Sequence, residues 1–431
     1  MKIPSLNTVF LLAFAASSVD GTEIGPTDDI EVAVAALNPG EELVLRGGTY
    51  TFNENITLRA NGTAAEPIMV RAKEGERPIL TQATNQQNVV EIRGSSHLVI
   101  RGIEFTGGSQ GIRLMDSDYI TIEDCEIHET GDVAISANNG GTYEGLKILR
   151  NHIHHTNGTG EAMYLGCNND ACRIANSLIE GNYIHHTNRS TVTQGDGIEI
   201  KDGSYANIVR DNVIHDTRYP GILVYSAAGN GAANIIERNV IWNVGDNTVQ
   251  MAADVVFRNN IVLGNVAMQS HQSGSPSNIE FVHNTIISSG NAVGVRDVTG
   301  PVLIANNAIY AQGTALQLIS GDLGQVQLAG NVGEGGLTGA NSGYSNGSGI
   351  ASDMVDADYS GRPPVDPFPA PGSALIAAGD DNHIVADDFN GMPRAGAADA
   401  GAYLYKEGGN PGWHISAAFK SIAQGTRPNP P

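Results

Sequence analysis

A short repeated pattern constrains this chain more than any other feature. An asparagine followed two residues later by an isoleucine recurs through the middle of the sequence, and Cys125/Ile127 and Ile103/Phe105 fill the same position in two earlier units. The asparagine pairs are Asn151/Ile153, Asn182/Ile184, Asn212/Ile214, Asn239/Ile241, Asn259/Ile261, Asn284/Ile286 and Asn307/Ile309. Successive units are 20 to 31 residues apart, which is typical of β-helix coils with loops inserted at some turns. Leucine-rich repeats have overlapping periods, but their Leu-rich consensus is missing.

Each unit contains three short apolar alternations. In residues 196–219 we expect Ile198 and Ile200, then Ile208, and then Val213 or Ile214 to point inward. Three strands per coil build a parallel sheet on each of three faces, and an inward asparagine at each turn can bond the backbone groups of neighbouring coils. The sequence therefore predicts an all-β chain, a single-stranded right-handed parallel β-helix with an internal asparagine ladder.

The two ends of the repeat differ from its middle. Residues 27–38 form the pattern of a short amphipathic helix that covers the first coil. The repeat fades from about residue 325, and the Gly-, Pro- and Asp-rich tail is expected to fold back on the last coil through residues 386–405. We therefore divide the chain into a signal peptide (1–21), a right-handed parallel β-helix (22–325), and a C-terminal cap and tail (326–431).

Several features indicate export. Lys2, a short apolar run at 9–16 and the following serines read as a signal peptide, and the run is too short to span a bilayer. Cys167 and Cys172 flank a polar loop and can pair in an oxidising compartment. We expect a secreted or periplasmic protein. The formal charge of −22 gives no general basic surface, so nucleic acid is not an expected partner.

Alignment of the first strands of successive coils gives two outward columns of polar residues. One column contains Tyr164, Glu199, Gln250 and Gln269, and the other contains Lys201, Tyr225, His271 and Arg296. The turns before this face add Glu161, Asp196, Arg218 and Tyr219. Because neighbouring coils lie about 4.8 Å apart, successive members of a column touch. The pattern predicts a lateral groove centred on Lys201.

These residue types suit removal of a proton next to a carboxylate, which needs a base, neutralisation of the carboxylate and an acid for the leaving oxygen. We predict Lys201 as the base. Arg218, Arg296 or a Ca²⁺ ion can neutralise the carboxylate, and Tyr225 or His271 can protonate the leaving group. The predicted calcium ligands are Glu161, Asp196 and Glu199. The predicted substrate-binding residues are Tyr164, Tyr219, Gln250, Gln269 and Arg296.

Other interpretations stay open at this point. Lys201 can simply pair with Glu199 or Asp202 on a solvated sheet. Two carboxylates among Glu161, Asp196 and Glu199 can support glycoside hydrolysis. A noncatalytic glycan-binding protein is a third class. The histidine pairs at 154/155 and 185/186, with His128 and His215, recur at one turn, and their register favours a structural stack over a metal site.

Three segments resemble polysaccharide lyase family six, which includes chondroitinase B and alginate lyases. TAAEPIMVRAKEGERPIL (63–80) and EIRGSSHLVIRGIEFTGG (91–108) resemble its opening coils, and GDGIEIKDGSYANIVRDNVIHD (195–216) is similar to its catalytic coil, in which acidic residues precede the catalytic lysine. The resemblance implies that Lys201 is the base and that Asp196 and Glu199 belong to a calcium site.

The following coil departs from that family. The family carries Arg-His-Gly with the arginine as acid, whereas this chain reads PGILVYS (220–226), with Tyr225 in that place and Arg218 in the preceding turn. The sequence thus predicts a divergent β-helix lyase that cleaves a uronate-containing glycan by β-elimination, acting as a monomer on an anionic polysaccharide. A uronate C5-epimerase shares the first proton abstraction and stays open. Pectate lyases with parallel β-helices also use a Lys or Arg base with Ca²⁺, so the sugar is not fixed.

Overall fold

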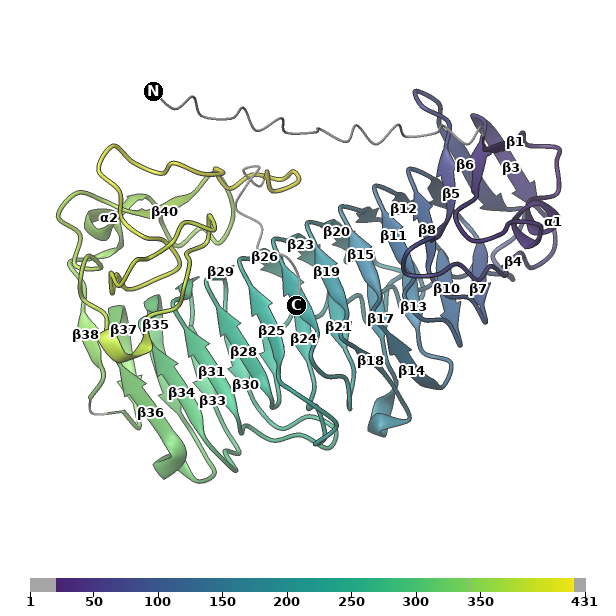
Figure 1. Cartoon of the computed structure of the whole chain (residues 1–431). Coiled ribbons are helices and arrows are strands. Elements are labelled where there is room, and N and C mark those ends of the chain that lie inside the picture. Colours follow the sequence, from purple (N-terminus) through teal and green to yellow (C-terminus); the bar gives the residue numbers. More distant parts are fainter. Residues whose placement is uncertain (1–20, 341, 422–431) are drawn as a thin grey trace, which may run out of the picture.

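The backbone forms a long parallel β-helix (Figure 1). The computed structural model describes residues 21–340 and 342–421, so residues 1–20 of the predicted signal peptide lie outside the described residues. Each coil contributes three short strands, and strands of successive coils pair in parallel on three faces. The predicted all-β class is confirmed. In the described part of the chain, no helix has the length and apolar character needed to cross a membrane.

Face A is a 13-stranded parallel sheet. Its strands are β1 (Thr22–Ile24), β2 (Glu42–Leu45), β5 (Ile68–Ala72), β8 (Leu98–Arg101), β11 (Thr121–Glu123), β15 (Lys147–Leu149), β19 (Leu178–Glu180), β22 (Ile208–Arg210), β25 (Asn234–Glu237), β28 (Val255–Arg258), β31 (Ile279–Val282), β34 (Val302–Ala305) and β36 (Val326–Ala329). A small parallel pair, β14 (Gly141–Glu144) and β18 (Cys172–Ala175), lies in the turns that directly precede the face A strands β15 and β19.

A second, 23-stranded sheet forms the other two faces. The groove face consists of β4 (Thr57–Leu58), β7 (Val90–Arg93), β10 (Ile112–Met115), β13 (Ile135–Ala137), β17 (Met163–Leu165), β21 (Ile198–Ile200), β24 (Ile222–Val224), β27 (Val249–Met251), β30 (Val266–Met268), β33 (Val293–Val295) and the ends of β35 (Ala308–Leu318) and β37 (Asn331–Thr338). The cap face consists of β3 (Gly48–Phe52), β6 (Pro78–Gln82), β9 (Glu104–Thr106), β12 (Glu126–His128), β16 (His152–His154), β20 (Tyr183–Thr187), β23 (Val213–Thr217), β26 (Val240–Val244), β29 (Ile261–Leu263), β32 (Thr285–Ser288), the starts of β35 and β37, and β38 (Tyr344–Asn346).

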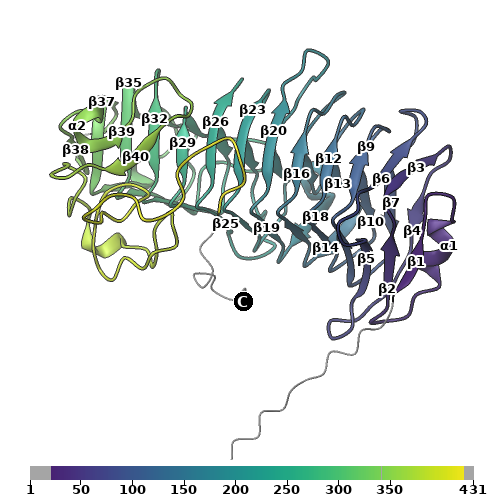
Figure 2. The ribbon, with the colours of Figure 1, turned by 90° about the horizontal axis from the view of Figure 1, so that it is seen from above.

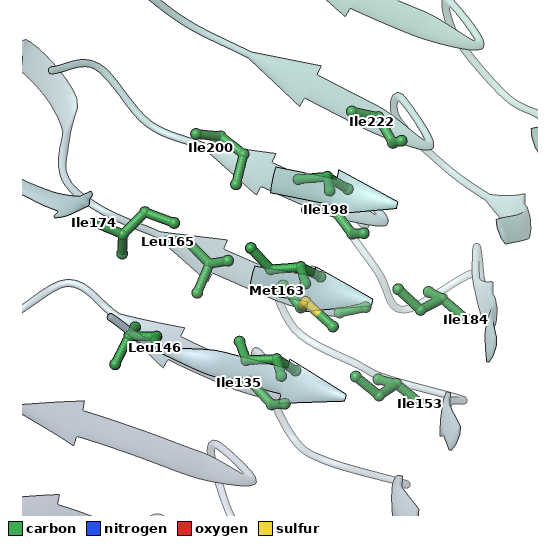
Figure 3. Close-up of a cluster of buried hydrophobic side chains, with 14 of the residues drawn as sticks. Ile135, Leu146, Ile153, Met163, Leu165, Ile174, Ile184, Ile198, Ile200 and Ile222 are labelled. Atoms are coloured by element: carbon green, nitrogen blue, oxygen red, sulfur yellow. The ribbon is translucent and has the colours of Figure 1, made fainter. Parts of the chain in front are cut away.

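The interior is filled by stacked apolar side chains. Figure 3 shows part of this stack, in which Ile153 and Ile184 come from the cap face and Ile135, Met163 and Ile198 come from the groove face. Ile198, Ile200 and Ile214 point inward as predicted. On face A the prediction of Ile208 is wrong: Val209 is fully buried in the core and Ile208 is partly exposed. Asn207 at the preceding turn is itself buried and hydrogen-bonded, which moves the inward alternation by one residue.

The asparagine ladder is present at the turn before the cap face. Each side chain accepts a backbone N–H of the preceding coil and donates to a carbonyl, as Asn212 does with Asn182 N and Ile179 O. Cys125 occupies the first position, where its N–H donates to Asn151. One member is Asn260 and not the predicted Asn259, because Val240 pairs with Ile261 and the Asn259 side chain bonds the C-terminal tail.

Both ends of the solenoid are covered. Helix α1 (Ile30–Ala35) buries Ile30 and Val34 against the first coil, and Asp29 caps its N-terminus. The sheets continue through β38, about one coil past the predicted boundary at residue 325, because Asn331 extends the ladder.

The C-terminal cap lies along the cap face over several coils, not only on the last coil as predicted (Figures 1 and 2). It contains α2 (Ile350–Asp353) and an antiparallel pair, β39 (Met354–Asp356) and β40 (Asp366–Pro369). Its apolar side chains, such as Phe368 and Phe389, pack on outward residues of β23 to β37, including Trp242. The outward side chains of these strands are apolar and would otherwise be exposed to solvent, so the C-terminal cap covers the whole C-terminal half of the cap face.

Candidate active site

A groove of about 680 Å³ lies across the groove face from β13 to β27. Its lining residues are Gln110, Asp132, Val133, Asn138, Thr159, Glu161, Tyr164, Asn168, Gln194, Asp196, Glu199, Lys201, Tyr219, Pro220, Leu223, Tyr225, Asp246, Gln250, His271 and Gln272. Among these lining residues of the described chain, Lys201 is the only lysine or arginine, whereas five are Asp or Glu. An anionic ligand in this groove therefore needs added positive charge.

The strand register brings the central residues together. Burial of Ile198 and Ile200 turns Glu199 outward on β21 and Lys201 outward just after it. In register, Tyr164 on the preceding coil lies beside Glu199, and Tyr225 follows β24 on the next coil. The period-2 alternation of three successive strands thus places these four side chains on one patch, as the sequence predicts.

Lys201 is 4% exposed and is surrounded by polar and aromatic groups. Its Nζ donates to Glu199 Oε1 at 2.7 Å and to the Tyr225 hydroxyl at 3.1 Å, and it lies 4.5 Å and 4.4 Å from the ring centres of Tyr164 and Tyr225. The Tyr225 hydroxyl also donates to Glu199 Oε1 at 3.0 Å. Lys201 does pair with Glu199, as the alternative interpretation expected, but both side chains are 4% exposed, so the pair is buried and not on a solvated sheet.

Three buried carboxylates, Glu161, Asp196 and Glu199, offer oxygens that all lie within 4.8 Å of one another. Glu161 and Asp196 are in register at the turn before β17 and β21, as predicted. Burial raises the pKa of Asp196 well above its usual range, and the nearby charges of Glu199 and Glu161 add to this effect. Burial also raises the pKa of Glu161. In the described structure, Asp196 Oδ1 and Glu199 Oε2 are buried without a hydrogen-bond partner.

A calcium ion fits this donor set. Hard carboxylate oxygens are its preferred ligands, and a cation satisfies oxygens that otherwise repel one another. The Thr159 hydroxyl lies 2.5 Å from both Asp132 Oδ1 and Glu161 Oε2, and its one proton can serve only one of them. An extra proton or a cation would supply the partner that one of these oxygens lacks.

The remaining predicted contacts divide into lining and non-lining residues. Tyr164, Gln250 and His271 line the groove, and Tyr219, 41% exposed, stands at its rim. His271 lies beyond β30 in a loop, and its ring stacks on Tyr225 at 4.6 Å between ring centres. Burial lowers the pKa of His271, and the charge of Lys201 adds to the effect.

The predicted placement of Gln269 in the Glu199 column is wrong by two residues. Gln250 pairs with Ala267 in β30, so Gln269 is in register with Ala252 instead. The cause is the core: Val266 and Met268 are buried inside the helix, and the predicted register would have turned Ser270 inward. In the described structure Gln269 does not line the groove.

Two predicted arginines also lie apart from the central cluster. Arg218 is exposed and borders an adjoining hollow of about 390 Å³, which shares Tyr219 with the groove. Arg296 is exposed and follows β33, three coils beyond Tyr225, or about 14 Å along the helix. Neither is among the described lining residues of the groove.

Sequence reasoning missed several lining residues, above all Asp132, Thr159 and Asp246. They lie in turns, where inserted loops hide the repeat. A signal for Asp132 existed, because it directly precedes Val133, the residue in register with Glu161. Cys167 and Cys172 form a disulfide that closes the loop carrying the lining residue Asn168, as the spacing allowed.

The family model described as "Pel9A-like, right handed beta helix region" matches residues 11–232, about half of the chain. The chain belongs to the Pel9A-like right-handed β-helix family. A general right-handed β-helix model matches residues 179–309, and the predicted handedness is confirmed.

Sequence relatives of this family member are pectate lyases. Pectate lyase PEL9 of Emericella nidulans is 25% identical over 332 residues, covering 68% of this chain and 76% of that protein. Pectate lyase L of Dickeya dadantii is 27% identical, and the match spans 33% of this chain and 37% of that protein. These matches support the predicted class, a β-helix polysaccharide lyase.

Solved structures share the fold. The crystal structure of pectate lyase Pel9A aligns with a TM-score of 0.51 at 15% identity over 90% of this chain and 98% of that chain. A mannuronic acid-specific family six lyase from the human gut microbiota aligns with a TM-score of 0.45 at 14% identity, over 76% and 90% of the two chains. The family model that matches half of this chain is the Pel9A-like one.

Proposed function

We propose that the protein is an exported polysaccharide lyase that cleaves a uronate-containing glycan by β-elimination in the groove. The observation that carries the proposal is Lys201, the only lysine or arginine among the described lining residues of an acidic groove, with its Nζ hydrogen-bonded to Glu199 and Tyr225. Family membership supports the class, and the pectate lyases among the relatives make polygalacturonate the first substrate to test. The Cys167–Cys172 disulfide supports an oxidising compartment.

In the proposed reaction, the neutral amine of Lys201 takes the proton from C5 of the uronate. The C4–O bond to the leaving sugar breaks, a C4=C5 double bond forms, and the Tyr225 hydroxyl gives its proton to the leaving oxygen. Because Lys201 Nζ and the Tyr225 oxygen are 3.1 Å apart, the proton taken from C5 can pass back to Tyr225 and restore both groups. Tyr164, Tyr219 and Gln250 are positioned to contact the sugars.

Glu161, Asp196 and Glu199 would hold a calcium ion beside this pair. When bound, the ion supplies the positive charge that neutralises the substrate carboxylate next to the proton to be removed. The acidity of the groove supports this requirement, since its five acidic lining residues repel a polyuronate. Arg218, exposed in the adjoining hollow, is suited to the carboxylate of a more distant sugar.

The test is incubation of the purified protein with polygalacturonate, alginate or chondroitin, with calcium or with EDTA, while following the ultraviolet absorbance of the new double bond. We expect absorbance with polygalacturonate and calcium, and none with EDTA. Lys201→Ala should lower kcat by roughly 10²–10⁴-fold. Lys147→Ala, an exposed lysine on face A, is the matched control and should keep the wild-type rate.

Other products would overturn the proposal. New reducing ends without absorbance, together with an active Lys201→Ala variant, would indicate a hydrolase. A change in uronate configuration without chain cleavage would indicate an epimerase. Binding without any product would indicate a glycan-binding protein.

A further inference from the structure

Seven of the protein's 12 histidines gather on or beside four neighbouring strands of the cap face, away from the groove. They are His128, His152, His154, His155, His185, His186 and His215. Four of them form a column of stacked rings, with centres 5.0 to 5.2 Å apart, that ends on Trp242. This column is the structural stack that the repeat register predicts. Ring stacking does not explain why ring nitrogens of His152 and His154 face the carboxylate of Glu126.

Three donor atoms converge at β12 and β16. Glu126 pairs with His152 across the two coils, and His154 lies two residues further on the same outward side. Glu126 Oε1 is 3.1 Å from His154 Nε2 and 3.7 Å from His152 Nδ1, and donor atoms of all three residues lie within 4.8 Å of one another. We call these three residues the Glu126 cluster.

The spacing matches that of ligands around a small metal ion. Zinc is bound by histidine nitrogens and carboxylate oxygens at about 2.0–2.2 Å in tetrahedral sites, so neighbouring ligand atoms are about 3.3 Å apart. The two measured separations, 3.1 and 3.7 Å, lie on either side of that value. Small side-chain rotations are enough to seat an ion between the three atoms.

The far side of each ligand is already held by another group. Arg77 Nη2 binds Glu126 Oε2 at 2.6 Å, which leaves Oε1 to face the two histidines. His154 Nδ1 lies 2.7 Å from His155 Nδ1, and His152 Nε2 lies 2.8 Å from His185 Nε2. Such outer contacts orient the ligands of metal sites and fix which ring nitrogen faces the ion. The side chains of Glu126 and His152 are each 30% exposed, so an ion can enter from solvent.

We propose that Glu126, His152 and His154 bind one divalent transition-metal ion, for which zinc is the best match to two imidazoles and a carboxylate. The ion joins two successive coils of the cap face and stabilises the folded chain. It differs from the groove carboxylates, whose all-oxygen donor set suits calcium. Nothing in this proposal depends on the reaction in the groove.

A second trio, His186, His215 and Asp216, is less suitable. Asp216 Oδ2 lies 2.6 Å from His215 Nδ1, a direct hydrogen-bond distance that leaves too little room for two ligands of one ion, and it is 3.9 Å from His186 Nε2. Asn243 also occupies the other oxygen of Asp216. The two trios therefore give different predictions for substitution.

The test uses the full chain without a histidine tag, stripped by a chelator and then saturated with calcium to fill the groove. Calorimetric titration with Zn²⁺ should show one equivalent bound in the wild type, and Co²⁺ should give the visible absorption of a tetrahedral site. Glu126→Gln and His154→Gln should each weaken zinc binding at least tenfold. His128→Gln, which removes a ring stacked on His154 but outside the three donors, and His186→Gln should keep it.

Absence of a zinc equivalent in the wild type would overturn the proposal, and so would unchanged binding in Glu126→Gln or loss of binding in His186→Gln. Because a variant can fail to fold, anomalous X-ray scattering from zinc-soaked wild-type crystals gives an independent answer. The ion should lie between Glu126, His152 and His154, and a zinc peak only elsewhere would contradict the site.

Discussion

Among single side chains, Tyr225 and His271 are the two candidates for the acid that protonates the leaving oxygen, and their surroundings separate them. Burial, with the charge of Glu199, raises the pKa of Tyr225 far above its usual range, so its hydroxyl keeps its proton at neutral pH. Burial and the charge of Lys201 lower the pKa of His271, so its ring is neutral there and a poor proton donor. Tyr225→Phe should therefore lower kcat on polygalacturonate by roughly 10²–10⁴-fold, and His271→Gln by less than tenfold.

Tyr225→Phe keeps the ring that stacks on His271 and covers Lys201, so its unfolding temperature should stay close to that of the wild type. Steady-state rates of the two variants check the assignment. A larger loss in His271→Gln than in Tyr225→Phe would give the acid role to the histidine.

At the scale of single elements, the asparagine ladder provides hydrogen bonds to the buried backbone N–H and C=O groups at the turns before the cap face. Asn212 accepts the N–H of Asn182 at 2.9 Å and donates to Ile179 O and to the Asn239 side chain, all in the buried interior. Asn212→Ala leaves these groups without partners, so the free energy of unfolding should fall by about 2–4 kcal/mol. Urea unfolding measures this loss. Asn346→Ala, on exposed β38, is the control, and an equal loss there would contradict the ladder's role.

The same elements show how far sequence reasoning reaches. The repeat predicts three strands per coil and the outward columns of β17, β21 and β24, because a period of two and a buried aliphatic pair fix the register of each strand. It fails where two registers look equally good from the sequence. Two adjacent asparagines, Asn259 and Asn260, compete for one ladder position, and the register of β29 together with the contact of Asn259 with the tail decides between them. At β30 the choice between Val266 and Met268 as the first inward residue moves Gln269 out of the groove column.

For the whole molecule, the C-terminal cap was the least predictable part, because it has no repeat and its contacts join residues more than a hundred positions apart. Arg394 in the cap is buried and bonds Asn259, and Lys420 is buried against Asp211 and the Phe389 carbonyl. The sequence predicts that residues 386–405 fold back on the last coil, but it gives no sign that Arg394 and Lys420 are buried. Their burial shows that the cap is an integral part of the fold, so solution conditions that charge groups beneath it will act on the whole chain.

His283 lies under this cap and gives a pH dependence with a defined sign. Burial lowers its pKa to about 3, with the charge of Arg394 adding to the effect, against about 6.5 in an unfolded chain. Between these two values the unfolded state binds a proton that the folded state does not. The contribution of His283 is therefore complete above about pH 6.5 and is lost as the pH falls toward 3. Because the side chain is almost fully buried, the loss at pH 4.5 should be of the order of 2–3 kcal/mol.

His283→Asn removes this titration. As the pH falls from 7.5 to 4.5, the free energy of unfolding of the wild type relative to that of the variant should therefore decrease by the contribution that His283 loses. Comparing the variant with the wild type at each pH cancels the titration of the groove carboxylates, which act in the opposite direction because burial raises the pKa values of Asp196 and Glu161. The control is His414→Asn, since the His414 side chain is 70% exposed, and its free energy of unfolding should follow that of the wild type at every pH. If the free energies of unfolding of the wild type and of His283→Asn fall in parallel over this range, the loss of stability in acid arises from protonation of groups other than His283.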